Sequence, residues 1–279
     1  MAHKILAKRR LSSRLYEFWL TSETIPKYAK PGQFLIIRID EKGERVPLTI
    51  VETSERKVKI IVKCIGKSTF QLALLDEGTE LSEVVGPLGN SSEIRDYGHV
   101  CVIGGGVGIA PLLPTARALS AAGNKVTSIL GAASSEQLIL LEEFEELSDD
   151  LVVMTDDGSA GEKGLVTDAL EKLLDEKEVN QIWAIGPAVM MKFVSAVAAD
   201  RDIPCWVSLN TIMVDGTGMC GACRAEVDGE IRFACVDGPE FDGRNVNWNE
   251  LIKRQFQYTE LETAALKRFE EEVGDLSWV

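Results

Sequence analysis

The alternation of apolar runs with helical patterns between residues 98 and 203 constrains the fold more than any other feature of the sequence. Helical patterns occupy 165–174 and 188–199. Short, mainly apolar runs lie before and between them, at Val100–Ile103, Val126–Leu130, Leu151–Met154 and Gln181–Ile185. Strands that are buried on both faces and alternate with helices form parallel sheets. We therefore predict a parallel α/β domain over residues 98–203.

The segments on either side have different patterns. Residues 1–97 contain many short runs rich in Ile, Val and Phe between Gly and Pro turns, which is typical of a small antiparallel β-barrel. Residues 204–247 begin with one more apolar run and are then rich in Gly and Cys, as expected for a module that a bound group holds together. Residues 248–279 form a tail with Leu261, Ala265, Phe269 and Val273 at helical spacing. This tail is expected either to pack on its own domain or to form an arm for a partner subunit.

Charge and composition exclude several classes of function. The 279 residues include 30 Lys and Arg against 44 Asp and Glu, a net charge of −14 that repels nucleic-acid phosphates. The only histidines are His3 and His99, which argues against a histidine-based catalytic triad. No apolar run approaches the roughly 20 residues needed to span a bilayer, and the N-terminal residues lack the apolar core of a secretory signal. We expect a cytoplasmic protein with no membrane or nucleic-acid partner.

The cysteines point to an iron–sulfur site. Residues Asp215, Cys220, Cys223 and Cys235 have the spacing D-x4-C-x2-C-x11-C. Plant-type 2Fe–2S loops have the spacing C-x4-C-x2-C followed by a later Cys, so Asp215 occupies the first ligand position and is our candidate carboxylate ligand. Two alternatives stay open at this point: a zinc site completed by Cys205, and Asp215 as a solvated loop carboxylate. The remaining cysteines, Cys64 and Cys101, are expected to be small buried apolar residues, as is Cys205 in the absence of zinc.

A glycine turn between a strand and a helical pattern predicts a nucleotide site. Glycine lets a pyrophosphate approach the N–H groups at a helix N-terminus, and the candidate residues here are Gly104, Gly105, Gly106, Val107 and Gly108. Two further turns follow the third and fourth strands, and their candidate residues are Asp156, Asp157, Gly158, Gly186, Pro187 and Met190. The carboxyl ends of parallel strands share one edge of a sheet, so we expect a shared site. The segment after the second strand has no Arg to pair with a 2′-phosphate, which favours NAD(H) over NADP(H).

Two segments of the β-rich part carry groups suited to a flavin dinucleotide. Arg45 offers a guanidinium that can hold a diphosphate, and Thr49 offers a hydroxyl for the edge of a flavin ring. Pro47 and Leu48 lie between them. The turn Gly66, Lys67, Ser68 and Thr69 is a second candidate phosphate site. Either segment alone is an ordinary turn, and it is the order of the motifs along the chain that is informative.

In that order the motifs PGQF, ERVPLTI, GKST, GPLGN, GGGVGIAP, TDDGS, GPAVMMK and VDGTGMCGAC resemble the ferredoxin–NADP reductase superfamily over about residues 4–247. Within it the chain is similar to iron–sulfur flavoprotein subunits such as the electron-transfer subunit of dihydroorotate dehydrogenase B. It is more similar still to the small subunits of electron-bifurcating NADH-dependent reduced ferredoxin:NADP oxidoreductases. The latter carry Asp at the position of Asp215, where the dihydroorotate-type subunits carry Cys. In many reductases the flavin-contacting Arg lies three residues before the hydroxyl, whereas Arg45 lies four before Thr49, and Leu48 stands where an aromatic often stacks on the flavin.

The resemblance implies an oxidoreductase subunit with FAD, a 2Fe–2S cluster and NAD(H). Hydride would pass between NAD(H) and FAD, with Thr49 as a contact of flavin N5 and no catalytic acid or base. Single electrons would pass through the cluster to a large subunit that carries FAD and iron–sulfur clusters, and through it to ferredoxin. Alternatives are the electron-transfer subunit of a dihydroorotate or sulfide dehydrogenase, and a non-enzymatic redox sensor.

Overall fold

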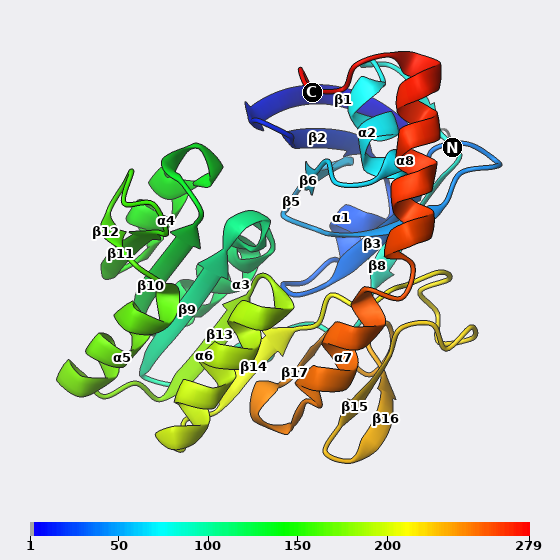
Figure 1. The fold of residues 1–279 in the computed structure, drawn as a ribbon. Coiled ribbons are helices and arrows are strands. Elements are labelled where there is room, and N and C mark those ends of the chain that lie inside the picture. Colours follow the sequence, from blue (N-terminus) through cyan, green and yellow to red (C-terminus); the bar gives the residue numbers. More distant parts are fainter. Residues whose placement is uncertain (1–2) are drawn as a thin grey trace.

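The computed structural model describes residues 3–279, and within this range the strands form four sheets (Figure 1). Two of the sheets make an N-terminal antiparallel β-barrel, with strand orders β5-β6-β2-β1-β7 and β4-β3-β8. The strands are β1 (His3–Ser12), β2 (Leu15–Thr21), β3 (Phe34–Arg38), β4 (Arg45–Thr49), β5 (Glu52–Ser54), β6 (Lys57–Lys63), β7 (Glu80–Leu81) and β8 (Glu83–Leu88). Short helices α1 (Ile25–Tyr28) and α2 (Lys67–Leu74) connect them. The fold class expected from the sequence is confirmed for this part of the chain.

The middle of the chain folds into a mostly parallel seven-stranded sheet of order β12-β11-β10-β9-β13-β14-β17. The parallel strands are β9 (His99–Gly105), β10 (Lys125–Ala132), β11 (Asp150–Thr155), β12 (Glu162–Lys163), β13 (Gln181–Ile185) and β14 (Cys205–Ser208). The connecting helices are α3 (Ile109–Ala121), α4 (Leu141–Leu147), α5 (Val166–Glu176) and α6 (Ala188–Asp200), with short 3₁₀ turns η1 (Gly106–Gly108) and η2 (Ser135–Gln137). The apolar strand runs are buried because α3 and α4 pack on one face of the sheet and α5 and α6 on the other. The predicted parallel α/β fold is confirmed, and the sheet also includes β14 and β17, which lie beyond residue 203.

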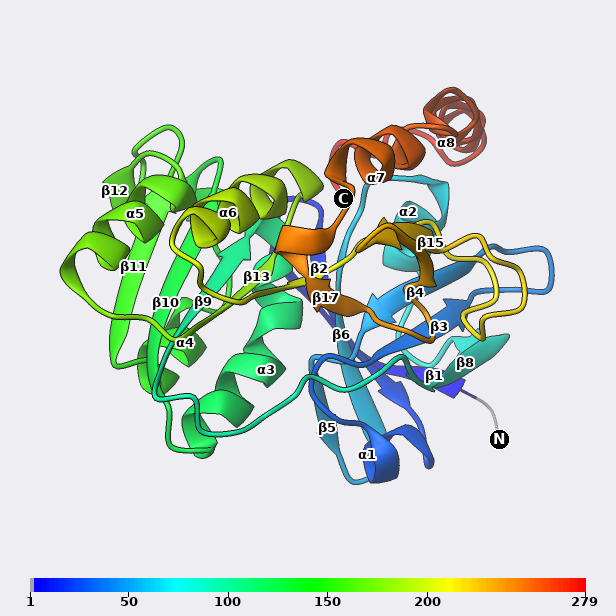
Figure 2. The same cartoon turned by 90° about the horizontal axis from the view of Figure 1, so that it is seen from below.

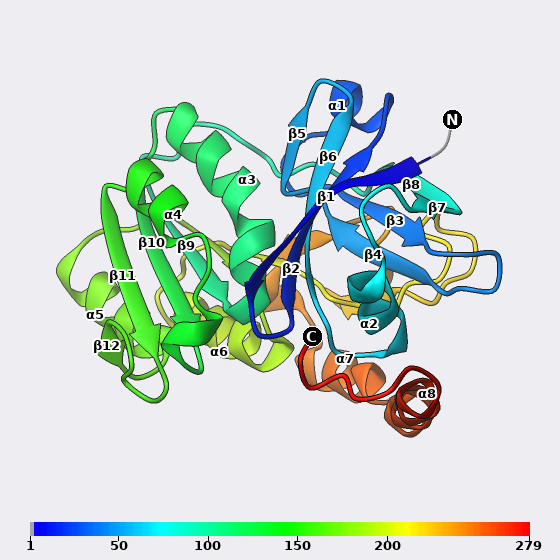
Figure 3. The ribbon, with the colours of Figure 1, turned by 90° about the horizontal axis from the view of Figure 1, so that it is seen from above.

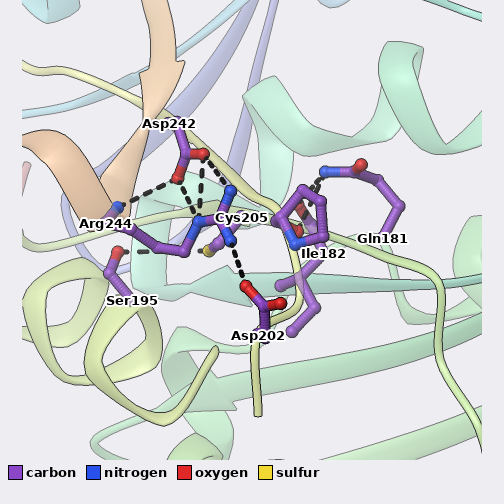
Figure 4. A network of polar contacts seen from close by, with 8 residues as sticks. Gln181, Ile182, Ser195, Asp202, Cys205, Asp242 and Arg244 are labelled. Carbon is purple, nitrogen blue, oxygen red and sulfur yellow. Dashed lines mark hydrogen bonds and ion pairs between the residues drawn. The ribbon is translucent and has the colours of Figure 1, made fainter. Parts of the chain in front are cut away.

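The Gly- and Cys-rich segment contributes a strand to that same sheet. Its last strand, β17 (Glu240–Asp242), pairs antiparallel with β14, whereas β15 (Arg224–Val227) and β16 (Glu230–Phe233) form a separate hairpin. The 3₁₀ turn η3 (Gly243–Asn245) follows. Figure 4 shows the polar seam at this edge, where Arg244 donates to both carboxylate oxygens of Asp242 and its Nη1 lies 3.4 Å from a carboxylate oxygen of Asp202. The pairing of β17 with β14, together with the contact of Arg244 with Asp202, joins this segment to the parallel sheet.

The tail forms two helices, α7 (Trp248–Gln255) and α8 (Thr259–Val273). Helix α7 packs beside α6 and β15, whereas α8 crosses to the barrel and runs along α2 (Figures 1 and 2). Within α8 the Phe269 side chain is buried in the barrel core, but Leu261 and Val273 are exposed. The helix predicted from the apolar spacing is confirmed. The tail packs on its own chain, and its helix α8 packs on the N-terminal barrel, which is far from it in sequence.

A half-buried carboxylate lies where the three parts of the chain meet. Glu240 of β17 accepts a 2.7 Å hydrogen bond from Ser92, which follows the barrel, and a longer one of 3.4 Å from the Trp183 indole on β13. The Ser92 hydroxyl is also 3.0 Å from that of Thr115 in α3. Loss of hydration raises the pKa of Glu240. Helix α3 lies beside the barrel strand β5 (Figure 3). Arg117 of α3 is 3.9 Å from the Glu52 carboxylate on β5, so the three parts make direct polar contacts.

Candidate functional site

The glycine turn and the turn after β13 form one compact edge of the nucleotide-binding sheet. A Cβ on Gly108 would collide with the carbonyl oxygen of Ile185 and lie 2.7 Å from the Gly186 Cα. A Cβ on Gly105 would meet the Met190 side chain and Pro187 in the same way. Gly108 therefore touches the second turn backbone to backbone, which requires glycine there, whereas Gly105 faces the Met190 side chain. Strand order reverses at this point, since β9 connects onward to β10 on one side and pairs with β13 on the other, and ligands of open α/β sheets bind there.

Gly106 differs from the other glycines of this turn. Its φ is +55°, and no atom lies within 4 Å of where a Cβ would stand. Gly106 and Val107 begin the 3₁₀ turn η1 that leads into α3, and the first N–H groups of a helix have no carbonyl partner within it. This is the arrangement that a pyrophosphate requires.

The turn after β11 lies on the same edge but two strands away. The Asp156 amide donates to the carbonyl of Ala132, the last residue of β10, and the Asp157 amide donates to that of Ala133. The Asp157 carboxylate accepts from the backbone and the hydroxyl of Ser159, and these bonds hold its pKa below the usual range. Gly158 completes the turn with φ +78°. The structure thus brings residues 156–158 to the loop after β10 rather than into contact with the glycine turn.

The two candidate flavin segments converge in the barrel. Ser68, at the start of α2, donates a 2.5 Å hydrogen bond to Glu44, the residue before Arg45. Arg45 in turn donates from Nε and Nη2 to Glu83 on β8 at 3.0 and 2.8 Å. The hydrogen bonds from Arg38 and Arg45 hold the pKa of Glu83 below its usual range. These contacts join the segment of Glu44 and Arg45 to the start of α2 and to β8.

The remaining candidate residues of these two segments lie in a helix-start turn or on strand β4. Thr69 accepts from the Gly66 amide at 3.1 Å and donates to the Gly66 carbonyl, so it closes the turn at the start of α2. Pro47 and Leu48 lie on β4, and Thr49 is the cross-strand partner of Phe34. Phe34 is buried and packs against Gly89. An open cavity of about 430 Å³ lies next to Lys67, and its lining residues are Asp40, Glu41, Lys42, Gly43, Lys67 and Gln71.

The cysteine module contains one close pair of thiols. Cys223 and Cys235 are buried, and their sulfur atoms are 3.2 Å apart. Loss of hydration on burial raises the pKa of the Cys235 thiol to about 12, and the neighbouring Cys223 acts in the same direction. Cys220 is exposed, and its sulfur accepts a 3.5 Å hydrogen bond from the Ala222 amide. Within residues 3–279, no three His, Cys, Asp or Glu side chains converge closely enough to hold a metal ion.

Asp215 is tied to the same loop. Its carboxylate accepts hydrogen bonds from the Cys220 amide at 2.8 Å and from the amide and hydroxyl of Thr217. These bonds favour the charged form and hold the Asp215 pKa well below the usual carboxyl range. Gly216, Gly218 and Gly221 have positive φ angles, which allow the loop to curve around a bound group. Three thiols and a carboxylate on this loop and the adjoining segment are a donor set that fits a 2Fe–2S cluster.

The cluster loop packs directly on the barrel. A Cβ on Gly216 would collide with Ile36 of β3 and meet Leu88 of β8 at 3.1 Å. Asn90 follows β8. Its backbone N–H donates to the Gly238 carbonyl at 2.7 Å, and its side-chain NH₂ donates to the Val236 carbonyl. Figure 2 shows the loop beside β3, β4 and β8. The cysteine loop and the sheet that carries Thr49 are therefore neighbours.

Cys205 takes no part in this site. It is buried in β14 with its sulfur 4.0 Å from the Ser195 hydroxyl, and burial raises its pKa to about 12. Cys64 and Cys101 are buried as well, as expected. The sequence did not single out Glu44 and Glu83, because their contacts with Ser68 and Arg45 depend on barrel closure. Glu44 is the first residue of the ERVPLTI motif, but its contact with Ser68 is not visible in that motif, and Glu83 lies in none of the motifs.

The barrel, the nucleotide sheet with its glycine edge and the cysteine loop define a ferredoxin-reductase-like oxidoreductase with an appended iron–sulfur module. Two family models match this description. The model of the iron–sulfur cluster binding domain of dihydroorotate dehydrogenase B matches residues 210–247. The model of the oxidoreductase NAD-binding domain matches residues 102–196.

Known proteins resemble the chain over nearly its full length. A Thermotoga maritima protein described as a dihydroorotate dehydrogenase B (NAD(+)) electron transfer subunit homolog is 52% identical over 98% of this chain and 97% of its own length. The dihydroorotate dehydrogenase B (NAD(+)) electron transfer subunit of Caldanaerobacter subterraneus is 35% identical over 86% of this chain and 96% of its own. The chain belongs to this family of iron–sulfur electron-transfer subunits. Its cofactors are FAD, a 2Fe–2S cluster and NAD(H).

Solved structures agree with this assignment. A structure described as NADH-dependent reduced ferredoxin-NADP oxidoreductase, from work on flavin-based electron bifurcation, superposes with a TM-score of 0.91. It is 52% identical and covers 96% of this chain and 98% of its own. Phthalate dioxygenase reductase, at 18% identity and a TM-score of 0.59 over 81% of this chain and 86% of its own, shares the fold. Among the described residues, no helix has the length and apolar character needed to cross a bilayer.

Proposed function

We propose that the chain is the small subunit of an electron-bifurcating NADH-dependent reduced ferredoxin:NADP oxidoreductase. The observation that carries this proposal is the match over nearly the whole chain to a structure of that enzyme, at 52% identity and a TM-score of 0.91. Asp215 supports it, because the resemblance places Asp at this position in the bifurcating small subunits and Cys in the dihydroorotate-type subunits.

In this proposal the glycine edge of the sheet holds NAD(H). The backbone N–H groups of residues 104–108 bind the pyrophosphate, and the open Gly106 marks the point of closest approach. Residues 186–190 touch this turn and border the reacting end of the nucleotide. The turn of residues 156–158 extends the same edge and contacts the outer part of the dinucleotide. NAD(H) is preferred over NADP(H), because the loop after β10 offers no Arg for a 2′-phosphate.

FAD lies in the barrel, with its diphosphate between Arg45 and the start of α2 at residues 66–69. Glu83 orients the Arg45 guanidinium, and Glu44 orients the Ser68 hydroxyl. Pro47 and Leu48 border the ring system, and Thr49 offers its hydroxyl to the ring edge near N5. The cavity beside Lys67 accommodates another part of the dinucleotide.

Asp215, Cys220, Cys223 and Cys235 hold the 2Fe–2S cluster. When bound, FAD supplies two-electron hydride chemistry with NAD(H) and the cluster supplies one-electron transfer. The protein contributes position: Gly216 packs on Ile36 and Leu88, so the loop that holds the cluster lies against the sheet that holds the flavin. Hydride exchange needs no side-chain acid or base, which accounts for the scarcity of histidine.

The large subunit is proposed to carry its own FAD and iron–sulfur clusters and to deliver electrons to ferredoxin. Apolar side chains around the cysteine loop are exposed and mark its docking face: Val214, Met219 and Val236 are 53, 88 and 42% exposed. Contiguous exposed apolar groups are typical of interaction sites. We also propose a cytoplasmic location, because all six cysteines are free thiols, as expected in a reducing compartment.

Anaerobic purification of the tagged chain from its native cells, with the co-purifying subunit identified by mass, tests the proposal. A larger partner with flavin and several iron–sulfur clusters, and reduction of ferredoxin and NAD⁺ by NADPH, is the expected result. A chain that purifies alone, fully loaded and active as a simple reductase, would contradict the bifurcating assembly.

The second candidate is the electron-transfer subunit of a dihydroorotate or sulfide dehydrogenase. It is favoured by the curated relatives, which are described as dihydroorotate dehydrogenase B subunits. Recovery of a TIM-barrel flavoprotein as the partner, with dihydroorotate-dependent reduction of NAD⁺, would establish the dihydroorotate candidate. Stopped-flow mixing with NADH separates both enzymes from a redox sensor, because a sensor without a nicotinamide site would show no bleaching of flavin absorbance.

A further inference from the structure

Helix α7 holds the cysteine loop at two points through consecutive side chains of its last turn. Arg254 donates from Nη2 to the carbonyl oxygen of Ala222, at 3.2 Å. Gln255 donates to the carbonyl oxygen of Asn210, at 2.6 Å, on the segment that leads into the loop. Ala222 lies between Cys220 and Cys223, so the first contact is made inside the C-x2-C turn itself.

The Arg254 side chain is held in place rather than mobile at the surface. It is 15% exposed, and its Nε lies 3.6 Å from the Glu250 carboxylate one turn earlier. Helix α7 is anchored by the buried Trp248, whose indole donates to the Gly243 carbonyl at 2.9 Å, and by the buried Leu251. A cation that is fixed in this way interacts more strongly with nearby charge than an exposed one, because less water screens it.

The contact acts on the peptide group that connects Ala222 to Cys223. A hydrogen bond to the Ala222 carbonyl polarises that peptide, so its N–H, which belongs to Cys223, becomes a stronger donor. The Ala222 amide on the other side of the residue already donates to the Cys220 sulfur. Hydrogen bonds and positive charge near the ligand sulfurs favour the reduced, more negative form of an iron–sulfur cluster.

We propose that Arg254 is a positioning residue that sets the geometry of the Cys220–Cys223 turn and raises the reduction potential of the cluster. The inference deepens the proposed function, because it rests on the assignment of Cys220 and Cys223 as cluster ligands. Arg254 touches no ligand atom, so its effect passes through the Ala222 carbonyl and through its charge. Nothing in the spacing of the cysteines indicates this residue, which lies 31 positions after Cys223.

The test is a potentiometric titration of the purified holoprotein, followed by the electron paramagnetic resonance signal of the reduced cluster. Arg254→Gln removes the charge and the guanidinium fork, whereas Arg254→Lys keeps the charge alone. Lys253→Gln is the matched control, because it removes one positive charge from the neighbouring, exposed position of α7. Iron content and flavin absorbance are measured on every variant.

Arg254→Gln is expected to shift the one-electron equilibrium of the cluster toward the oxidised form by about tenfold, which corresponds to 59 mV. Its signal should change shape while iron per protein stays at the wild-type value. Arg254→Lys should recover part of the potential but not the wild-type signal. If Arg254→Gln does not retain its cluster, Arg254→Lys serves as the test, because its electron paramagnetic resonance signal should still differ from that of the wild type. A potential and signal in both Arg254 variants that match Lys253→Gln would overturn the proposal.

A separate variant distinguishes failure of this inference from failure of the ligand assignment. Cys220→Ser should lose iron or change the cluster signal. An unchanged signal in Cys220→Ser would remove the assignment, and the role of Arg254 would fall with it. A changed signal in Cys220→Ser together with a wild-type potential in Arg254→Gln would reject the role of Arg254 alone.

Discussion

Removal of one aromatic side chain should release the tail from the barrel. Phe269 is 8% exposed and packs with Leu266 into the barrel core, whereas most of α8 faces solvent. A buried Phe removes roughly 150–250 Å² from water, and Phe→Ala in a core costs about 3–5 kcal/mol. Because a helix at the surface can settle partly into the vacated space, we expect Phe269→Ala to weaken docking of α8 by about 3 kcal/mol.

Hydrogen exchange measured by mass spectrometry on peptides from residues 259–273 reads this quantity directly. Since each 1.4 kcal/mol is a factor of ten, 3 kcal/mol corresponds to about 100-fold faster exchange, with little change in the barrel strands. Leu261→Ala is the matched control, because it lies on the same helix, is 67% exposed and should change stability by less than about 0.5 kcal/mol. Equal exchange in the two variants would refute the reasoning that Phe269 anchors the tail.

Four further substitutions test the sites. Gly108→Ala should weaken NADH binding about tenfold with FAD content unchanged, because its Cβ collides with the Ile185 carbonyl; an unchanged dissociation constant in a fluorescence titration would contradict this. Arg45→Gln should release FAD on gel filtration while iron content is retained. Asp215→Ala should lower iron per protein and alter the cluster signal, and wild-type values for both would reject Asp215 as a ligand. The raised pKa of Glu240 means that its stabilising effect is present below the usual carboxyl range and is lost as the pH rises through the raised value. The Tm of the wild type should therefore fall relative to that of Glu240→Gln as the pH rises above the usual carboxyl range, and parallel curves would contradict this.

Local patterns were sufficient for the elements and for the order of the domains. The apolar runs of the middle segment became the strands β9, β10, β11 and β13, and the helical patterns at 165–174 and 188–199 became α5 and α6. Such predictions succeed because side-chain burial repeats with the period of the element itself. In the tail, the spacing of apolar residues did not predict which of them are buried. Its apolar spacing predicted a helix, but of Leu261, Phe269 and Val273 only Phe269 is buried, because the surface that receives it belongs to the barrel.

The candidate sites divide in the same way. The candidate cluster ligands and the glycine turn can be identified in the sequence, because ligand spacing and turn chemistry are properties of short stretches of chain. Three tertiary contacts cannot be read from the sequence. They are the contact of Gly108 with Ile185, the ion pair of Arg45 with Glu83 and the hydrogen bond from Arg254 to Ala222. Each joins segments that are dozens of residues apart and carry no shared period.

The sequence by itself determined what kinds of elements form, which turns lie at strand ends and which side chains can bind iron and a dinucleotide. These properties follow from periodicity, backbone preference and donor chemistry within short stretches. Only the tertiary structure decided that β17 extends the nucleotide sheet, that Gly216 lies on Ile36 of the barrel and that α8 returns to pack on the first domain. The physical reason is that such contacts depend on how buried surfaces match after the chain has folded, and local sequence patterns do not encode that match.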